Sequence, residues 1–470
     1  MKKLPVCLFV CSLALAQNRF TPGVKPFLAV DAPVIALQHV RVIDGTGAPP
    51  AEDQTIVIDH GRIAALGPSD RTPAPAGAQA IPLAGHTVIP GIVGMHEHLF
   101  YPSGGGIPMY NEHAFSFPRL YLASGVTTAR TGGSLEPYTD LNVKRLIDEG
   151  RMPGPKMWIT GPYLEGKGSF AAQMHELTGA DDAVRTVEYW AAEGVTSFKA
   201  YMNITRAELQ AAVEKAHQRG IKVTGHLCSV GFSEAAALGI DNLEHGLLVD
   251  TEFHPGKQPD VCPPNTRGEI EKLVLDSAPV HDMIATLVQH HVAITSTLAV
   301  FEAFDGNRPP LEQRFIDALT PEAAISYLSA RARAPGGKDS PTAAALKKEL
   351  EFEYAFVKAG GLLISGADPT GNGGALAGFA DQRNIELLVE GGFTPAQAIQ
   401  IATANGARFL GELDRIGTVA AGKQADLVVI DGNPAQRIAD IRKVKLVFKD
   451  GAGYDPARLL DSVRGAAGLH

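Results

Sequence analysis

Five side chains that can bind a metal ion stand near the ends of segments with β-strand character. His96 and His98 belong to "GIVGMHEHL" and are spaced i, i+2, so both imidazoles point to the same side of a strand. His226 lies near the end of "IKVTGHL", His245 of "IDNLEHG" and Asp368 of "GLLISGADP". A single strand histidine is more often a hydrogen-bonded core residue, and a single strand-end aspartate more often forms a turn. Together they predict a metal site, because imidazoles and a carboxylate are donors that Zn²⁺ prefers.

A lysine, Lys199, lies in another apolar strand-like segment, "GVTSFKAYM". Lysine is rarely buried without a partner, and burial and nearby divalent cations both lower its pKa. A neutral amine can add carbon dioxide and become a carbamate, whose two oxygens can each bind one metal ion. We therefore expect Lys199 to bridge two metals; the alternative is a structural salt bridge to Asp368 or Glu244.

The segments that carry these residues alternate with amphipathic helices. One helix is predicted after Thr205 as its N-cap, ending near Gly220. Eight strands alternating with helices over residues 91–411 predict a (β/α)8 TIM barrel, whose catalytic groups lie at the carboxyl ends of the strands. An open doubly wound sheet is the alternative, but no G-x-G-x-x-G motif opens its first helix. Residues 301–358 are predicted to be a mostly helical insertion at the substrate mouth.

Both ends of the chain differ from this middle part in their pattern of apolar and polar residues. Residues 32–90 and 412–455 alternate apolar and polar residues and are punctuated by Gly and Pro, which predicts one small β-sandwich domain built from both termini. Residues 17–31 are predicted to be a linker. Residues 1–16, "MKKLPVCLFVCSLALA", have the basic start, short apolar run and small-residue cleavage site of a signal peptide. We therefore expect an exported protein, periplasmic or secreted.

Composition narrows the range of partners. The chain has 470 residues, a formal net charge of −9 and no basic run, which argues against nucleic acid and, after signal cleavage, against a membrane surface. A small-molecule substrate and a homo-oligomer are compatible with this composition. Cys228 and Cys262 are the two cysteines left after cleavage, and nothing in the sequence places them together.

The motifs resemble those of a known family. The strings "PGIVGMHEHL", "SGVTTAR", "NLEHG", "ISGADP", "ATANGARFLG" and "GTVAAGKQADLVVIDGNP" are similar to the amidohydrolase superfamily, in its binuclear subtype with a carboxylated lysine. Their detailed wording looks like the imidazolonepropionase-related and Xaa-Pro dipeptidase (prolidase-like) branch. The resemblance runs from about Asp44 to Gly451.

This resemblance implies roles for the residues that match the family motifs. His96, His98 and Asp368 would bind one divalent metal, His226 and His245 a second, and the carbamate of Lys199 would bridge both; the donor set favours zinc. A hydroxide bridging the metals would attack an amide carbonyl, with Asp368 acting as base and then as acid.

The sequence departs from the family motifs at positions that could bind the substrate. Thr131 follows Arg130 where the branch usually has Asp, and "EGKGSFAAQMHE" replaces a Gly-Gly-His turn, which leaves His175 as a displaced candidate. Tyr201 lies two residues beyond Lys199 and could donate a hydrogen bond to an oxyanion, although packing explains it equally well. Arg130 could bind a substrate carboxylate or form a structural ion pair.

These observations predict a metal-dependent hydrolase that cleaves the amide bond of a dipeptide or an N-acyl amino acid. A cyclic amidase or lactonase using the same site is the first alternative. A periplasmic solute-binding protein that has kept the barrel without catalysis is a remote one, because it requires a missing ligand and none is missing.

Overall fold

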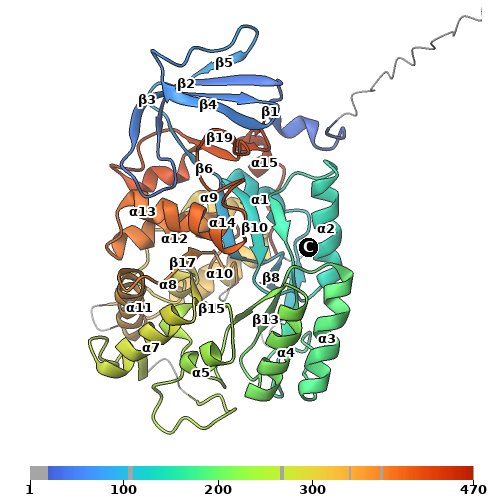
Figure 1. Cartoon of the computed structure of the whole chain (residues 1–470), viewed down its shortest axis with the longest axis vertical. Helices are drawn as coiled ribbons and strands as arrows, with labels where there is room; N and C mark the ends of the chain where they lie inside the picture. Colours follow the sequence, from blue (N-terminus) through green and yellow to red (C-terminus); the bar gives the residue numbers. More distant parts are fainter. Residues whose placement is uncertain (1–18, 104–108, 265–268, 338–339, 371–373, 469–470) are drawn as a thin grey trace, which may run out of the picture.

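The computed structural model describes residues 19–103, 109–264, 269–337, 340–370 and 374–468. The predicted signal peptide, residues 1–16, lies outside these ranges. The described chain forms a body of parallel strands and helices with a second β-sheet stacked at one end, drawn at the top of Figure 1. Among the described residues, no helix is both long and apolar enough to cross a membrane.

All eight segments predicted as central strands are strands in the structure. They form two parallel sheets, ordered β11-β10-β7 and β12-β13-β14-β15-β16-β17. Their bounds are β7 (Ile92–Glu97), β10 (Val126–Thr131), β11 (Lys156–Trp158), β12 (Thr160–Leu164), β13 (Ser197–Ala200), β14 (Lys222–Gly225), β15 (Asn242–Glu244), β16 (Ala293–Ser296) and β17 (Leu363–Ser365).

Residues 156–164 were predicted as one strand, which Ile159 divides into β11 and β12. A parallel bridge from Ser134 to Pro162 links the two sheets. On the other side, the chain after β17 meets β7, because the N–H of Asp368 donates to the carbonyl of His96 at 2.8 Å. The parallel arrangement is thus confirmed, and full closure of the strands into a barrel stays a prediction.

Helices connect these strands, as the alternation predicted. The helix predicted after Thr205 is α4, and Thr205 forms a capping box in which its N–H donates to Glu208 Oε2 at 2.9 Å. The helices around the strands are α1 (Phe117–Ala123), α2 (Pro137–Asp148), α3 (Ala180–Glu193), α4 (Arg206–Gln218), α5 (Phe232–Ala237), α7 (Ala278–Gln289), α12 (Phe379–Glu390), α13 (Pro395–Gln400) and α14 (Gly406–Phe409).

The segment between β16 and β17 is largely helical. It contains α8 (Leu298–Glu302), α9 (Gln313–Ala318), α10 (Pro321–Arg333) and α11 (Pro341–Lys358). Buried Glu349 and Glu353 on α11 accept hydrogen bonds from neighbouring segments. Glu349 accepts from Leu248 N in the 3-10 turn (Gly246–Leu248) after β15, and Glu353 accepts from Ser296 Oγ at the end of β16, both at 2.9 Å. A hairpin of β8 (Phe100–Ser103) and β9 (Met109–Glu112) follows β7.

The stacked sheet has nine strands and is built from both ends of the chain, with order β1-β20-β19-β18-β6-β2-β3-β4 and β5 beside β2. It has its own apolar core, which includes Ile35, Ile56, Val88, Leu427 and Phe448. The strands are β1 (Leu28–Val30), β2 (Val34–Val42), β3 (Ala51–Asp59), β4 (Arg62–Pro68), β5 (Gln79–Pro82), β6 (Thr87–Pro90), β18 (Leu427–Ile430), β19 (Val444–Lys449) and β20 (Ala452–Tyr454), and α15 (Pro456–Asp461) follows.

The predicted linker, residues 17–31, is partly folded instead. A 3-10 turn (Lys25–Phe27) leads into β1, which pairs with β20. Val24 and Val30 are buried, so burial of apolar side chains holds this segment on the sheet, and the linker prediction is wrong for residues 25–30. Whether the nine strands form a two-layered sandwich stays a prediction.

Candidate metal centre

The imidazole of His96 is fixed at the end of β7 by close backbone contacts. A Cβ atom at Gly366 would lie 2.3 Å from the backbone nitrogen of His96, and one at Gly132 would lie 2.3 Å from its Cδ2 atom. Only glycine allows both neighbouring chains to approach so closely. The "ARTGG" segment at the end of β10 and the "ISGADP" segment at the end of β17 therefore hold the histidine in place on β7.

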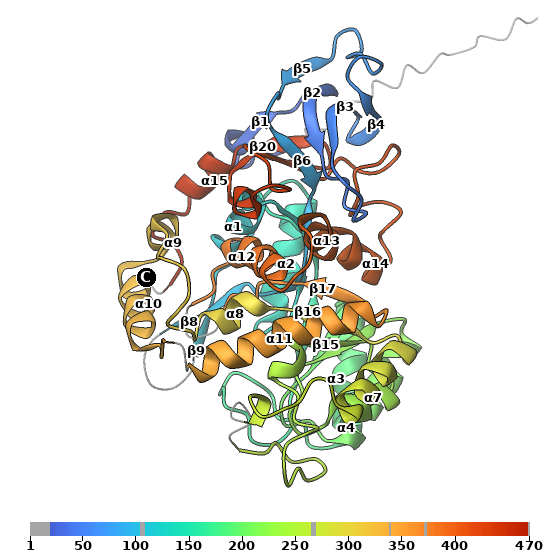
Figure 2. The ribbon, with the colours of Figure 1, turned by 90° about the vertical axis from the view of Figure 1, so that its left-hand side faces the viewer.

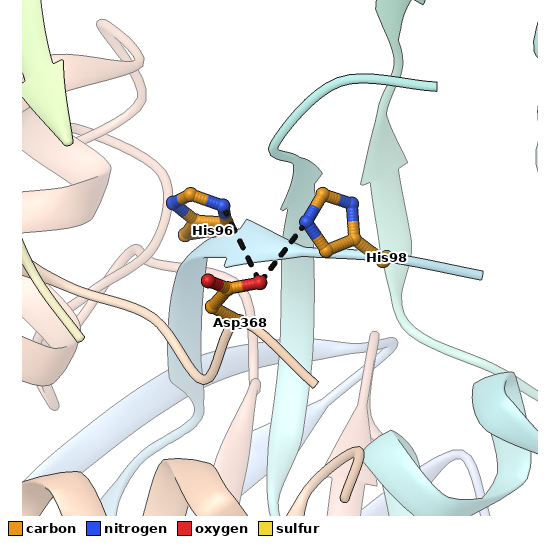
Figure 3. A group of neighbouring side chains, drawn as sticks. All are labelled: His96, His98 and Asp368. Atoms are coloured by element: carbon orange, nitrogen blue, oxygen red, sulfur yellow. Dashed lines mark ion pairs between the residues drawn. The ribbon is translucent and has the colours of Figure 1, made fainter. Parts of the chain in front are cut away.

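His96, His98 and Asp368 form a compact buried group (Figure 3). One donor atom from each lies within 4.8 Å of the others. Asp368 Oδ1 is 3.3 Å from His98 Nε2 and 3.8 Å from His96 Nε2. Asp368 has a left-handed backbone (φ 43°), an uncommon conformation for a residue other than glycine that is concentrated at functional sites.

His226 and His245 stand beside this group. The ring centroids of His226 and His245 are 4.5 Å apart, and those of His96 and His245 are 4.7 Å apart. His245 follows β15 with a left-handed backbone (φ 69°), which turns its side chain toward the other histidines. The structure therefore brings all four predicted histidines and Asp368 together at the carboxyl ends of their strands.

Lys199 lies on β13 at the centre of the cluster, and its side chain is buried. Its Nζ atom is 2.9 Å from His96 Nε2, and no carboxylate of the described residues lies within the 4.0 Å of an ion pair. Burial lowers the pKa of Lys199 to about 8, although Glu244 and Asp368 act in the opposite direction. The amine is therefore partly neutral near physiological pH, and the salt-bridge alternative is not supported.

The ring nitrogens that face away from the centre have their own partners. His96 Nδ1 is 2.7 Å from Glu244 Oε2, His98 Nδ1 is 3.2 Å from Gly133 O, and His245 Nδ1 is 2.7 Å from Thr297 Oγ1. With a proton on each Nδ1, every Nε2 atom is left as an acceptor. This donor set fits a divalent metal ion held by imidazole and carboxylate.

The protonation states are consistent with metal binding. Burial lowers the pKa of His98 to about 4 and that of His226 to about 3, and it holds the pKa of His245 well below its ordinary value. Burial alone would raise the pKa of Asp368, but His96 and the neighbouring histidines bring it well below its usual range. Neutral imidazoles and an ionised carboxylate are the forms that bind metals.

Arg130 does not reach this cluster as a substrate ligand. Its guanidinium is buried below the site and donates to Glu244 Oε1 at 2.7 Å, to Asn242 Oδ1 at 2.9 Å and to Met95 O at 2.8 Å. All its contacts are therefore made inside the protein, and the structural ion pair considered from the sequence replaces the predicted role in substrate binding.

A pocket of about 230 Å³ opens above the cluster, and Tyr201 lines it next to His226. His175 lies instead in a neighbouring cavity, exposed and 3.0 Å from Asp182 Oδ2, so the structure does not support its predicted place at the substrate. The pocket is lined by the five histidine and aspartate groups, Lys199, and Phe100, Tyr110, Leu135, Tyr163, Phe170, Met174, Tyr201, Val300, Phe301, Phe304 and Thr370.

Cys228 is bonded to Cys262. Cys228 lies two residues beyond His226, and the bond ties the loop around residue 262 to this strand end. The sulfur is therefore engaged in a disulfide and is not a free thiolate ligand.

Comparison with known proteins places this site in a family. The model of the amidohydrolase family matches residues 87–452. The chain belongs to the amidohydrolase family. It is 22% identical over 421 residues to a D-hydantoinase of Streptomyces coelicolor, covering 82% of this chain and 83% of that protein. The match confirms the superfamily resemblance and shows that the chain is a hydrolytic enzyme that acts on a small molecule.

Solved structures share the fold at low sequence identity. A putative prolidase from Bifidobacterium longum has a TM-score of 0.65 and 24% identity, covering 92% of this chain and 98% of its own. A Xaa-Pro dipeptidase with bound methionine has a TM-score of 0.67 and 20% identity, covering 90% of this chain and 100% of its own. These similarities imply a TIM-barrel catalytic domain.

Several residues around the cluster were not predicted. Phe100 stacks on His98 with ring centroids 4.2 Å apart, and Phe301 packs edge-on against His245. Thr297 directly follows β16, so the rule that selected the other strand ends would have found it. Phe100 and Phe301 belong to connecting segments, where the sequence has no period that indicates their direction.

Proposed function

We propose that the protein is a binuclear, metal-dependent hydrolase of amide bonds. The observation that carries this proposal is the convergence of four histidines, Asp368 and the buried Lys199 at one pocket. His96, His98 and Asp368 would hold one metal, and His226 and His245 a second. Carboxylated Lys199 would bridge them, and zinc is the metal that this donor set favours.

The metals would polarise the carbonyl and lower the pKa of a water molecule. Asp368 would accept a proton at its carboxylate and return it to the leaving amine, as base and then acid. Its low pKa and its burial beside His98 keep it ionised before the reaction. The Tyr201 hydroxyl stays protonated, because burial raises its pKa well above the ordinary value, so it can donate a hydrogen bond to the substrate.

The pocket lining narrows the substrate class. Among the described lining residues the only cationic side chain is Lys199, which lies within the proposed metal bridge, and seven members are aromatic rings of Phe or Tyr. Apart from the proposed metals, a free carboxylate of the substrate would therefore be desolvated without a cationic side chain to pair with in this lining. We propose an amide flanked by uncharged, aromatic or apolar groups, rather than the dipeptide or N-acyl amino acid predicted from the sequence.

The same observation favours a second candidate function. A cyclic amide or a lactone has no free carboxylate before ring opening, so it meets the same requirement of the lining. The cyclic amidase or lactonase alternative is therefore kept beside the linear amide.

A matched pair of substrates tests the proposal. N-benzoylphenylalanine and N-(2-phenylethyl)benzamide differ only in the carboxylate, and we expect the neutral amide to have a kcat/KM higher by about tenfold or more. A phenyl-substituted hydantoin and a lactone test the cyclic alternative. Met174→Lys adds a cation to the lining, so it should raise the kcat/KM for N-benzoylphenylalanine relative to that for the neutral amide.

The metal requirement is tested on the same substrates. Removal of metal by a chelator should abolish hydrolysis, zinc should restore it, and Asp368→Asn should lower it by about 10²–10⁴-fold. Preference for the free acid would contradict the substrate class alone. Failure of zinc-loaded protein to hydrolyse any of these compounds would contradict the function itself.

We also propose that the protein is exported. The signal-like residues 1–16 motivate this, and the Cys228–Cys262 disulfide supports it, because structural disulfides persist in oxidising compartments. N-terminal sequencing from the native host should find Gln17 first; a chain that begins at Met1 would contradict it.

A further inference from the structure

A second cavity lies across α8 from the metal pocket. Val300 and Phe301 of α8 line the metal pocket, whereas Ala299 and Glu302, with the following Ala303, line the second cavity. Its volume is about 80 Å³, and α10 and α12 complete its walls. The insertion that carries these residues is seen with α9 and α10 at the left of Figure 2.

Two arginines of this cavity share one tyrosine. Arg308 Cζ is 5.4 Å from the centroid of the Tyr327 ring, and Arg331 Nη1 donates to the Tyr327 hydroxyl at 3.3 Å. Each guanidinium also donates to a backbone carbonyl: Arg308 Nη1 donates to Ala303 O at 2.7 Å, and Arg331 Nη2 donates to Pro309 O. Neither guanidinium has a carboxylate within the 4.0 Å of an ion pair among the described residues.

The carboxylates that line the cavity are already engaged elsewhere. Both oxygens of Glu302 accept from Arg383, at 2.6 and 2.8 Å. Glu312 accepts from Arg314 and Arg442, both at 2.8 Å.

Asp305, which acts on the charge of Arg308, accepts from Asn307 N at 3.0 Å. Each carboxylate near the two arginines therefore already has a donor partner. Glu302 and Asp305 act on the charge of Arg308 at longer range, but neither Arg308 nor Arg331 has an ion-pair partner among the described residues.

Arg308 also has an unused donor. Its Nε–H is buried and has no hydrogen-bond partner among the described residues, and burial lowers the pKa of this guanidinium. Buried N–H groups nearly always have an acceptor, and adjacent like charges repel. An acceptor that is also an anion would satisfy both conditions.

We infer that the cavity between α8, α10 and α12 is a binding site for a small oxyanion, a carboxylate or a phosphate, held by Arg308 and Arg331. The planar forks of two guanidiniums match the oxygens of such groups. The cavity size suits a single anionic group, with Phe315 and Tyr327 as an apolar wall. This site is separate from the metal centre and does not depend on the proposed reaction.

Calorimetric titration of the metal-loaded enzyme tests this site. Sodium phosphate and sodium acetate are titrated separately, each against sodium chloride of equal ionic strength, which distinguishes the two sources of oxyanion. We expect Arg308→Gln and Arg331→Gln each to weaken binding of at least one anion by about tenfold or more. Arg333→Gln is the matched control, because Arg333 is exposed on the same helix and does not line the cavity.

The metal centre can bind the same anions, but that binding would persist in all three variants. Thermal unfolding without added anion establishes that each variant folds; Arg308→Lys, which keeps the charge and loses the fork, is used if Arg308→Gln does not fold. Equal affinity for both anions in the parent, the two cavity variants and Arg333→Gln would overturn the site. So would the absence of any saturable binding to the parent.

Discussion

Glu244 joins His96 to Arg130. One oxygen of its buried carboxylate lies 2.7 Å from His96 Nδ1, and the other lies 2.7 Å from Arg130 Nη2. The guanidinium fixes the carboxylate, and the carboxylate fixes the tautomer and ring direction of the histidine. Arg130 and Glu244 thus position His96, a proposed metal ligand.

Glu244→Gln should weaken metal binding by about 10–100-fold, because the amide no longer orients His96 as a carboxylate does. It should also lower the unfolding temperature, because Arg130 is left as a buried charge without its partner. The measurements are zinc affinity by competition with a chromogenic chelator and thermal unfolding of metal-free protein. Glu322→Gln, an exposed residue of α10, is the control. Unchanged zinc affinity in a folded Glu244→Gln protein would disprove the positioning role.

Lys199→Ala should remove the proposed bridging anion while leaving the histidines in place. Two cations would then lie close together with one anion fewer, so metal content and activity should both fall, activity by about 100-fold or more. Added acetate or propionate has the two-oxygen geometry of a carbamate and should restore part of both. The same acids should restore little activity or metal content to His245→Ala, which lacks an imidazole instead of the carbamate. Full activity with two bound metals in Lys199→Ala, without added acid, would rule out the carbamate.

Glu353→Gln should change how stability depends on pH. Glu353 is buried, which raises its pKa to about 8. The folded protein therefore binds a proton that the unfolded chain releases near pH 4.5, so the free energy of unfolding falls as pH rises from about 4.5 to about 8. Glutamine removes this loss and should stabilise the protein at pH 8 by about 4 kcal/mol, with little effect at pH 4.

Thermal unfolding at pH 4 and pH 8 measures this difference. Glu351→Gln, two residues away on the exposed side of α11, should show no such pH-dependent gain. Burial and the Glu353 carboxylate both raise the pKa of neighbouring Glu349, so the gain at pH 8 includes the loss of this repulsion in Glu353→Gln. Equal stabilisation by Glu353→Gln at both pH values would show that the pKa of Glu353 is not raised in the folded protein.

Removal of the Cys228–Cys262 bond should destabilise the protein. The bond closes a loop across a separation of 34 residues, for which loop-closure entropy predicts a loss of about 3–4 kcal/mol. The double variant Cys228→Ala, Cys262→Ala should therefore unfold at a lower temperature than the oxidised parent. A reductant should lower the unfolding temperature of the parent and leave that of the variant unchanged. If reductant leaves the unfolding temperature of the parent unchanged, the bond contributes no stability.

The strand ends were predictable because each carries a local signal. Runs of apolar and β-branched residues marked the central segments, most of them beside Gly or Pro, and the i, i+2 spacing of His96 and His98 fixed their common direction. The capping pattern at Thr205 located α4 for the same reason. The linker prediction was wrong because β1 is short and gains its stability from β20, more than four hundred residues later.

The surroundings of the site depended on contacts that no local pattern encodes. Arg130 was a candidate because it lies near a strand end, and His175 because it could replace a Gly-Gly-His turn. The direction of each side chain was set by an acid instead, Glu244 for Arg130 and Asp182 for His175. The Cys228–Cys262 pair and the aromatic lining likewise join segments far apart in the sequence. The candidate metal ligands were thus visible in single motifs, whereas the aromatic lining of the pocket required the assembled structure.

The order of strands in the stacked sheet has a consequence for synthesis. β6, at residues 87–90, pairs along its whole length with β18, at residues 427–430. An emerging chain therefore carries β6 with one unsatisfied edge until nearly all of the protein has left the ribosome. A chain that stopped before Leu427 would still contain every proposed metal ligand, yet it would expose that edge to other chains. The sheet thus makes the last tenth of the polypeptide a condition for a soluble product.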